Sequence, residues 1–139
     1  GRQAARSIDI VSRHLDPQMY DNRDFCEAVS QLITSSRRAR VRALVRHTEP
    51  VVKRGHRLVA LSQRLSSFIE IRVPAREFDE YNGAFLIVDG AGVIYRTLSD
   101  SFEATVNFNS ARTAQELSRQ FESMWQTALL DASLRRSNL

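Results

Sequence analysis

Residues 81–107, YNGAFLIVDGAGVIYRTLSDSFEATVN, decide the fold that this sequence predicts. The apolar run at residues 84–88 is typical of a strand that is buried on both faces. Residues 89–92 then predict a tight turn, because glycine readily adopts positive φ, and residues 93–95 return as the second strand of a hairpin. With a further short strand expected near residues 102–108, the stretch predicts three strands of one sheet.

The residues before this stretch alternate between strand and helix patterns. Strands are expected at residues 6–12, 37–46 and 68–73. A helix capped by Asp21 follows the first strand, and a second helix, capped by Thr48, follows the second. Gly55 falls inside that second helix, where glycine costs about 1 kcal/mol relative to alanine. This alternation predicts a parallel sheet with right-handed crossovers.

A final helix completes the predicted fold, and either Asn109 or Ser110 is expected to cap it. Its apolar side chains recur at helical spacing, at Ala114, Leu117, Phe121, Met124, Trp125 and Ala128. The whole prediction is an α/β fold. Its mixed sheet has about six strands, a parallel βαβαβ core plus the hairpin and the last strand, with helices on both faces. One domain is expected over residues 1–139, with a fraying tail at 131–139, and the abrupt start at Gly1 indicates excision from a longer chain.

Composition narrows the classes of protein to which the chain can belong. Its 42% hydrophobic and 26% charged residues are ordinary for a globular domain, and no apolar run approaches the roughly 20 residues that cross a bilayer, so no membrane partner is expected. Cys26 is the sole cysteine, which excludes an internal disulfide and favours a reducing cytoplasm. The net charge of +4, with Lys53 the sole lysine, permits an anionic partner, although a GC-rich genome explains the arginine excess equally well.

Two of the three histidines follow predicted parallel strands. His14 follows the first strand and His47 the second, and Arg13 and Arg46 stand directly before them. The carboxyl ends of parallel strands form the edge where ligands usually bind, so these four residues predict a site for a small phosphate-containing anion. The alternative is that they are solvated loop residues. His56 has no partner at metal-ligand spacing, and neither a metal nor a cofactor is expected.

A run of basic residues leads into and begins the predicted second strand. The arginines of this run are Arg37, Arg38, Arg40 and Arg42. Such a patch can contact nucleic-acid phosphates. However, 16 acidic residues nearly balance the 20 basic ones, and no aromatic residue interrupts the run. Nucleic-acid binding is therefore the alternative function rather than the first one.

The sequence also resembles one half of a phospholipase-D-like protein. In that family the signature strand reads His-x-Lys-x-x-x-x-Asp and a Gly-Ser-x-Asn element follows. Aligned on Asp89, the histidine position holds Asn82 and the lysine position holds Ala84, while residues 104–108 keep only Asn107 of the second element. The spacing of Phe121 and Trp125 is similar to that in the closing helix of the family.

The resemblance implies a fold that has lost its nucleophile and its cation. Asn82, Asp89 and Asn107 would mark a remnant site, phosphodiesterase activity would be a lesser alternative, and two halves would pack as a homodimer. The sequence is also similar to an uncharacterised bacterial domain found C-terminal to GNAT acetyltransferase domains, which implies an upstream acetyltransferase partner. The function expected is therefore that of a non-catalytic accessory or interaction domain.

Overall fold

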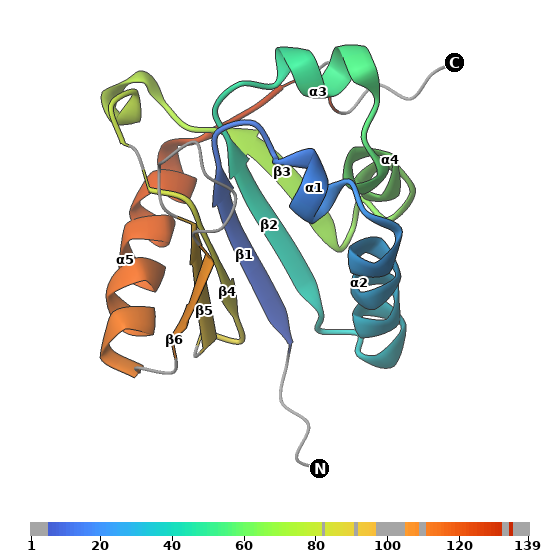
Figure 1. Cartoon of the computed structure of the whole chain (residues 1–139), viewed down its shortest axis with the longest axis horizontal. Helices are drawn as coiled ribbons and strands as arrows, with labels where there is room; N and C mark the ends of the chain where they lie inside the picture. Colours follow the sequence, from blue (N-terminus) through green and yellow to red (C-terminus); the bar gives the residue numbers. More distant parts are fainter. Residues whose placement is uncertain are drawn as a thin grey trace.

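A computed structural model describes residues 6–81, 83–90, 92–96, 105–108, 111–131 and 134, with residues 94–96 and 105–108 described by their backbone. Within this part of the chain, a seven-stranded mixed sheet has the order β6-β5-β4-β1-β2-β3-β7 (Figure 1). The strands are β1 (Ser7–Ser12), β2 (Arg40–Val45), β3 (Ile69–Val73), β4 (Phe85–Val88), β5 (Gly92–Arg96), β6 (Thr105–Phe108) and β7 (Leu129–Leu130). β1, β2 and β3 are parallel, and β4, β5, β6 and β7 pair antiparallel. The predicted α/β fold is confirmed, and the short β7 is an addition that the sequence pattern did not indicate.

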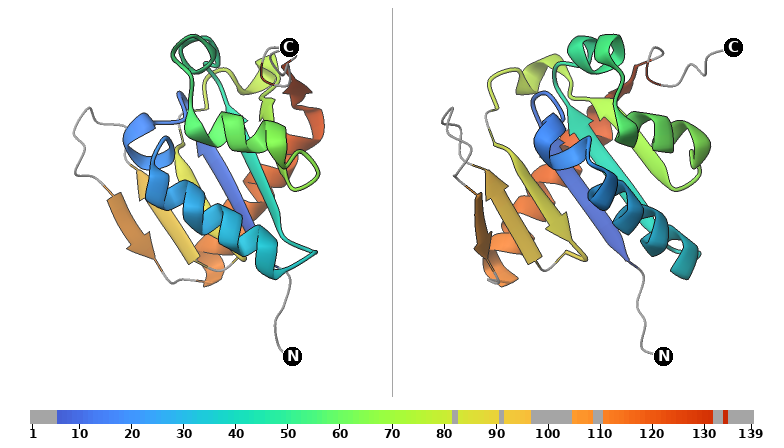
Figure 2. Two further views of the ribbon diagram at one scale, coloured as in Figure 1. Left: turned by 90° about the vertical axis from the view of Figure 1, so that its right-hand side faces the viewer. Right: turned by 45° about the vertical axis from the view of Figure 1, so that its right-hand side comes forward.

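Helices cover both faces of the sheet, as predicted (Figure 2). α2 and α4 pack on one face and α5 on the other, and α3 lies above the carboxyl ends of the parallel strands (Figure 1). In the described residues the helices are α1 (Pro17–Tyr20), α2 (Arg23–Ser35), α3 (Glu49–Arg54), α4 (Arg57–Arg64) and α5 (Ala111–Thr127), with a 3-10 helix, η1, at Arg76–Phe78. No helix in that part of the chain has both the length and the apolar composition needed to span a bilayer.

The alternation of side chains along each strand divides the interior into two apolar cores. On β2, Val41, Ala43 and Val45 pack in the core beneath α2 and α4, whereas Leu44 packs in the core beneath α5. The α5 core contains Val11, Leu44, Phe85, Ile87, Val93, Ala114, Leu117, Phe121, Met124 and Trp125. The apolar stripe predicted for the final helix therefore faces this core, with Ala128 packed at its edge.

Asn22 caps α2, so the prediction that Asp21 caps it is wrong. The Asn22 Oδ1 accepts hydrogen bonds from the backbone N–H groups of Asp24 (2.8 Å) and Phe25 (3.1 Å). Asp21 instead closes the short helix α1, and its carboxylate accepts a hydrogen bond from the Arg57 N–H at 2.9 Å. Both residue types are good caps. The preceding helix α1, which was not expected, decides which of them is used.

The single helix predicted after Thr48 is two helices. Gly55 ends α3 with φ of 81°, which glycine adopts without steric cost, and His56 caps α4 by accepting the Leu58 N–H at its Nδ1 (3.1 Å). Thr48 occupies the N-cap position of α3, but its hydroxyl donates to Asp131 at 2.8 Å. The glycine that weakened the predicted helix therefore marks its end.

Two further predictions concern the end of the chain. Asn109 and Ser110, the predicted caps of the last helix, lie outside the described residues. Of the tail expected to fray, Asp131 and Leu134 are described, and Leu134 is buried. The Leu134 carbonyl accepts a hydrogen bond from Gln63 of α4 at 2.9 Å, so this part of the tail packs against the body of the domain.

An ion cluster of Asp9, Arg42 and Glu122 joins α5 to the centre of the sheet. Asp9 and Arg42 are register partners on β1 and β2, and the guanidinium donates to both Asp9 oxygens (3.0 and 3.3 Å). The same guanidinium donates to Glu122 of α5 at 2.6 Å. It also lies 4.9 Å from the ring centroid of Phe121 and 5.4 Å from that of Trp125, so its charge is paired and its faces are covered by aromatic rings.

Burial and the partner's charge have opposite effects on the pKa values of Asp9 and Arg42. Burial raises the pKa of Asp9, against the opposing effect of the Arg42 hydrogen bond. Burial would also lower the pKa of Arg42, but hydrogen bonds to Glu122 and Asp9 outweigh it and raise that pKa. A buried pair of this kind is weak support for net stability, yet removing one partner leaves an uncompensated buried charge.

We therefore expect Arg42→Ala to destabilise the fold by about 3–5 kcal/mol. Asp9 would lose its counter-charge, and the aromatic rings would lose the guanidinium group that covers them. Urea unfolding followed by circular dichroism measures this change. Arg40→Ala is the matched control on the same strand, since Arg40 is exposed and its loss is expected to cost within about 0.5 kcal/mol. Equal losses for the two variants would contradict the assigned role of the ion cluster.

Candidate functional site

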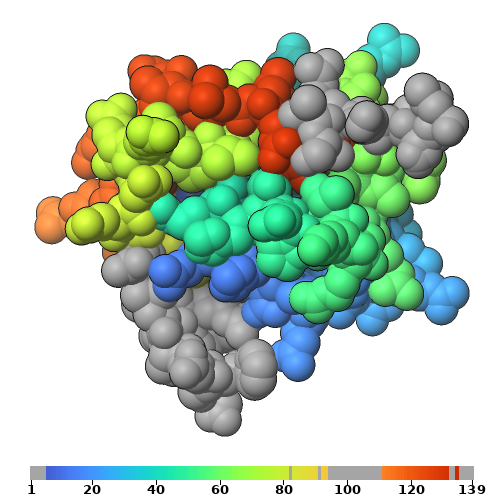
Figure 3. Space-filling view, turned by 90° about the horizontal axis from the view of Figure 1, so that it is seen from above, coloured from blue at the N-terminus to red at the C-terminus, as the bar shows by residue number. Residues whose placement is uncertain are grey.

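Basic side chains gather at the two opposite ends of the β1–β2 strand pair. At the carboxyl end, Ser12 and Val45 form the last register pair, so the chain leaves both strands at the same level. Figure 3 views the molecule from above, and the blue early part of the chain lies beside the teal part that includes α3. The His47 N–H donates to the Arg13 carbonyl at 2.8 Å, and the rings of His14 and His47 stack with centroids 5.2 Å apart and planes 26° apart. We call the exposed side chains of Arg13, His14 and His47 the histidine rim. The structure places the two histidines together, as expected from their positions after parallel strands.

A strained turn beneath His14 fixes the histidine rim. Leu15 is fully buried and has φ of 56°, an uncommon value for a residue that is not glycine. Its N–H donates to the Ser12 hydroxyl at 2.9 Å, and its carbonyl lies 2.9 Å from the His56 Nε2. Because His56 Nδ1 accepts the Leu58 N–H, the His56 ring is neutral with its proton on Nε2. Sequence patterns gave no signal for this support, which joins residues far apart in the chain.

Arg46 takes a different role from the other residues predicted for the anion site. Its guanidinium donates to the Phe78 carbonyl, to the Tyr81 carbonyl at 3.1 Å and to the Asp79 carboxylate at 3.3 Å. These bonds hold the segment around η1 against the end of β2. Arg46 therefore positions the loop and contributes positive charge, while the histidine rim is the part that faces solvent.

The charged groups that act on His47 in the rim are all basic. Burial, followed by the charges of His14, Arg13 and Arg46, lowers the pKa of His47. The positive charge of each of these neighbours disfavours protonation of His47. A bound anion would reverse that effect, and this coupling makes the rim a candidate site.

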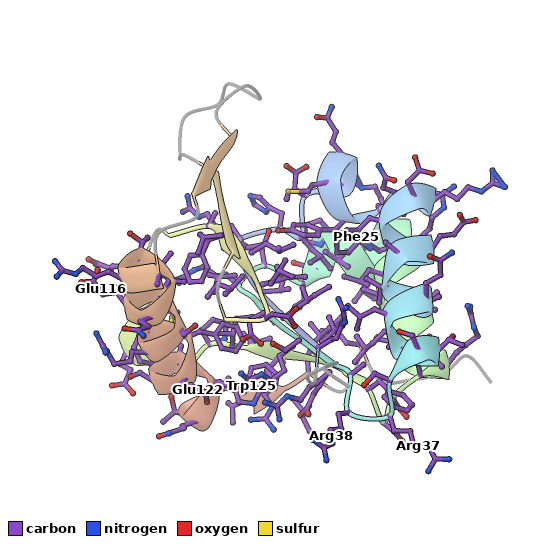
Figure 4. All side chains as sticks on the ribbon, turned by 90° about the horizontal axis from the view of Figure 1, so that it is seen from below. Phe25, Arg37, Arg38, Glu116, Glu122 and Trp125 are labelled. Atoms are coloured by element: carbon purple, nitrogen blue, oxygen red, sulfur yellow. The ribbon has the colours of Figure 1, made fainter. Side chains whose placement is uncertain are left out.

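Arginines form the second group, at the amino end of the same strand pair. The Arg40 N–H donates to the Arg6 carbonyl at 3.1 Å, while Arg37 and Arg38 lie in the turn between α2 and β2. Figure 4 shows Arg37 and Arg38 projecting away from the sheet. We call the exposed side chains of Arg6, Arg37, Arg38 and Arg40 the arginine edge. Among the described residues, none of these four guanidinium groups makes a hydrogen bond or an ion pair.

Arg42 does not belong to this surface, and the expectation that it forms part of a basic patch with Arg37, Arg38 and Arg40 is wrong. Its side chain is 11% exposed and is held in the ion cluster. Arg40 and Arg42 are two residues apart on β2, so the alternation of a strand puts them on one face. Because α5 covers only part of that face, Arg42 is buried and Arg40 remains in solvent. The strand pattern contains no information about the position of α5.

Two of the three residues that the resemblance marks as a remnant site, Asp89 and Asn107, are described. Asn82 lies outside the described residues. Asp89 sits in the turn after β4 with φ of 56°, and its carboxylate accepts the Ser7 N–H at 2.8 Å. Asn107 lies on β6 and pairs with Ile94 of β5. It is therefore two strand spacings, or about 10 Å, from β4, and its level along the sheet is three residues away from that of Asp89. The structure does not bring Asp89 and Asn107 together.

A hollow of about 390 Å³ lies between α4 and the outer strands β3 and β7. Its charged member, Glu70, accepts a hydrogen bond from Arg72 at 2.7 Å, and its Ser62 hydroxyl donates to the Val59 carbonyl at 2.7 Å. Across the described part of the chain, no group of three or more His, Cys, Asp or Glu side chains is arranged to hold a metal ion. The basic ends of β1–β2 are therefore the better candidate sites.

Residues 1–136 match the family model described as Domain of unknown function (DUF7931). The chain belongs to this family. A search of curated proteins gave no match. Among solved structures, this DUF7931 domain is similar to the archaeal chromatin protein TrmBL2, whose structure "shows a novel mode of DNA binding", with a TM-score of 0.58 and 15% sequence identity. The match covers 90% of this chain and 45% of TrmBL2, so the chain spans less than half of that protein, and the likeness concerns the fold.

His56 makes the turn beneath the histidine rim sensitive to pH. Burial lowers the pKa of His56 below its ordinary 6.5, so the unfolded chain takes up this proton at a higher pH than the folded chain does. The free energy of unfolding should therefore fall as the pH drops below about 6.5. Urea midpoints measured from pH 7.5 to 5.5 test this, with His56→Asn expected to flatten the profile and His14→Asn to preserve it. A flat profile in the parent protein would show the assignment to be wrong.

Proposed function

We propose that this DUF7931 domain is a non-catalytic binding module that contacts the phosphate backbone of nucleic acid through the arginine edge. The observation that carries the proposal is that Arg6, Arg37, Arg38 and Arg40 are all exposed and that no described residue pairs with their guanidinium groups. The planar, forked guanidinium group matches the geometry of phosphate oxygens, and it stays charged at any physiological pH. Four such groups at one end of a strand pair form a surface that is positive without internal compensation.

A contrast with four arginines that form bonds within the domain strengthens this argument. Arg42, Arg46 and Arg72 make hydrogen bonds or ion pairs within the domain, and Arg57 pairs with Asp21 at 3.3 Å. Those arginines hold the fold together. The arginine edge has no such structural role in the described residues, so its charge is available to a partner.

The similarity to TrmBL2 supports the proposal only at the level of the fold. TrmBL2 is described as a chromatin protein that binds DNA, and the matched region is 45% of its length. The arginine edge, rather than this likeness, therefore identifies the surface that we propose. Catalysis is not part of the proposal, because the resemblance to phospholipase-D-like proteins aligns their nucleophile with Asn82 and their lysine with Ala84.

Titration of a fluorescent 20-base-pair duplex at several salt concentrations tests the proposal. The parent is expected to bind at 50 mM salt and to weaken steeply by 200 mM, because phosphate contacts release counterions. The triple variant Arg37→Gln, Arg38→Gln, Arg40→Gln should lower the slope of log K against log salt by about 2.7, at about 0.9 for each lost contact. Unfolding midpoints should stay close to those of the parent, since the three side chains are exposed.

A matched control removes the same charge elsewhere. Arg23, Arg112 and Arg119 are exposed on α2 and α5, and replacing all three by glutamine changes the net charge equally. This control should keep most of the salt slope. Equal losses in the two triple variants would indicate a response to net charge alone, and an absence of binding by the parent at 50 mM salt would overturn the proposal.

We also propose, from the resemblance to phospholipase-D-like halves, that the domain forms a homodimer and adjoins an acetyltransferase domain in longer proteins. Light scattering is expected to give twice the 15.9 kDa of one chain. A monomeric mass at high protein concentration would count against the dimer. It would leave the duplex-binding proposal untouched, because the arginine edge is complete within one chain.

A further inference from the structure

We propose that the histidine rim is a second, separate site that binds a tetrahedral oxyanion of the phosphate type, most strongly at mildly acidic pH. The site lies at the carboxyl end of β1–β2, whereas the arginine edge lies at the amino end. Its groups are the stacked imidazoles of His14 and His47 and the guanidinium of Arg13. The inference does not depend on nucleic-acid binding.

Geometry gives the first support. Two exposed imidazoles with centroids 5.2 Å apart can both donate to one tetrahedral oxyanion that lies across their edges. The backbone on both sides is fixed, because the His47 N–H is bonded to the Arg13 carbonyl and because Leu15 is anchored between Ser12 and His56. The rim is therefore held in place before any ligand arrives, which lowers the entropic cost of binding.

Charge gives the second support. His14, Arg13 and Arg46 all act on His47 with positive charge. Three of the acidic residues around the rim bond to other groups: Asp79 pairs with Arg46, Asp131 accepts the Thr48 hydroxyl, and Asp16 caps α1. The fourth, Glu49, is exposed at the start of α3. One protonated ring of the stacked pair repels a proton on the other. A doubly charged anion removes this repulsion, so binding and protonation should reinforce each other, as linked equilibria must.

The exposure of the rim determines how a ligand would lie on it. The small hollow beside the rim is lined by Ser12, Arg13, Arg46, Tyr81 and Gly83 among others, and its cavity volume of about 10 Å³ is room for about one water molecule. His14 and His47 do not line this hollow, and both are exposed. The ligand that suits the site is therefore a terminal phosphate, free or on a monoester, which lies on the exposed rings while the rest of the molecule projects into solvent.

Calorimetry and NMR test the site with defined anions. Inorganic phosphate, glycerol phosphate and sulfate are titrated into the full chain at pH 5.5 and 8.0. Sulfate remains a dianion over this range, so its pH dependence reports the protein groups alone. We expect at least about tenfold tighter sulfate binding at pH 5.5, together with proton uptake that depends on buffer ionisation. Tighter binding of glycerol phosphate than of phosphate would indicate a monoester, and the reverse would indicate free phosphate.

Variants separate this site from the arginine edge. The ring resonances of His14 and His47 should shift on titration while those of the buried His56 should not, and His14→Asn with His47→Asn should abolish the pH dependence. The Arg37, Arg38, Arg40 triple variant should retain it while losing duplex binding. Unshifted His14 and His47 resonances, pH-independent sulfate binding, or an undiminished response in the double histidine variant would each overturn the proposal.

Discussion

The buried contact between Arg42 and its acidic partners is the constraint around which the domain is arranged. Without α5, the guanidinium of Arg42 would have Asp9 alone on an open sheet face, and Glu122 and the aromatic rings of α5 complete its shell. Arg72 repeats the arrangement one strand further along, 4.3 Å from the Trp125 ring centroid and bonded to the Trp125 carbonyl at 3.1 Å. Charged and aromatic groups thus fix where the helix lies and which way it is turned. Directional contacts of this kind specify an arrangement more than they add net stability.

This arrangement determines which arginines reach the surface. β2 carries two arginines at alternate positions, Arg40 and Arg42, and Arg42 is buried in the interior. The exposed arginines of the arginine edge lie where these strands begin, and Arg13 lies with the two histidines where they end. Because β1 and β2 are parallel and in register, the residues that leave them meet at common edges. The strand pair therefore has a polar centre covered by α5 and two basic ends that are open to solvent.

The sequence predicted the elements well and their partners poorly. Apolar runs and alternation located the strands, because the two-residue period of a strand can be read directly from the order of apolar and polar residues. The position of His14 and His47 followed from the same logic, since parallel strands bring their ends together. Arg42 was misjudged because its burial depends on a helix some 80 residues away. The cap at Asn22 was missed because the unexpected helix α1 uses Asp21, and the break at Gly55 was missed because the apolar spacing continues across it.

The two basic ends of β1–β2 can act independently. A strand of six residues is about 20 Å long, whereas charges are screened over about 8 Å at physiological ionic strength. A ligand at one end therefore changes the potential at the other very little. The arginine edge alone holds four cations, which equals the whole formal excess of +4, so the rest of the chain is balanced. The arginine edge therefore stays positively charged at any physiological pH. The histidine rim, in contrast, becomes strongly positive only when its imidazoles take up protons, so pH governs one end of the strand pair and leaves the other unchanged.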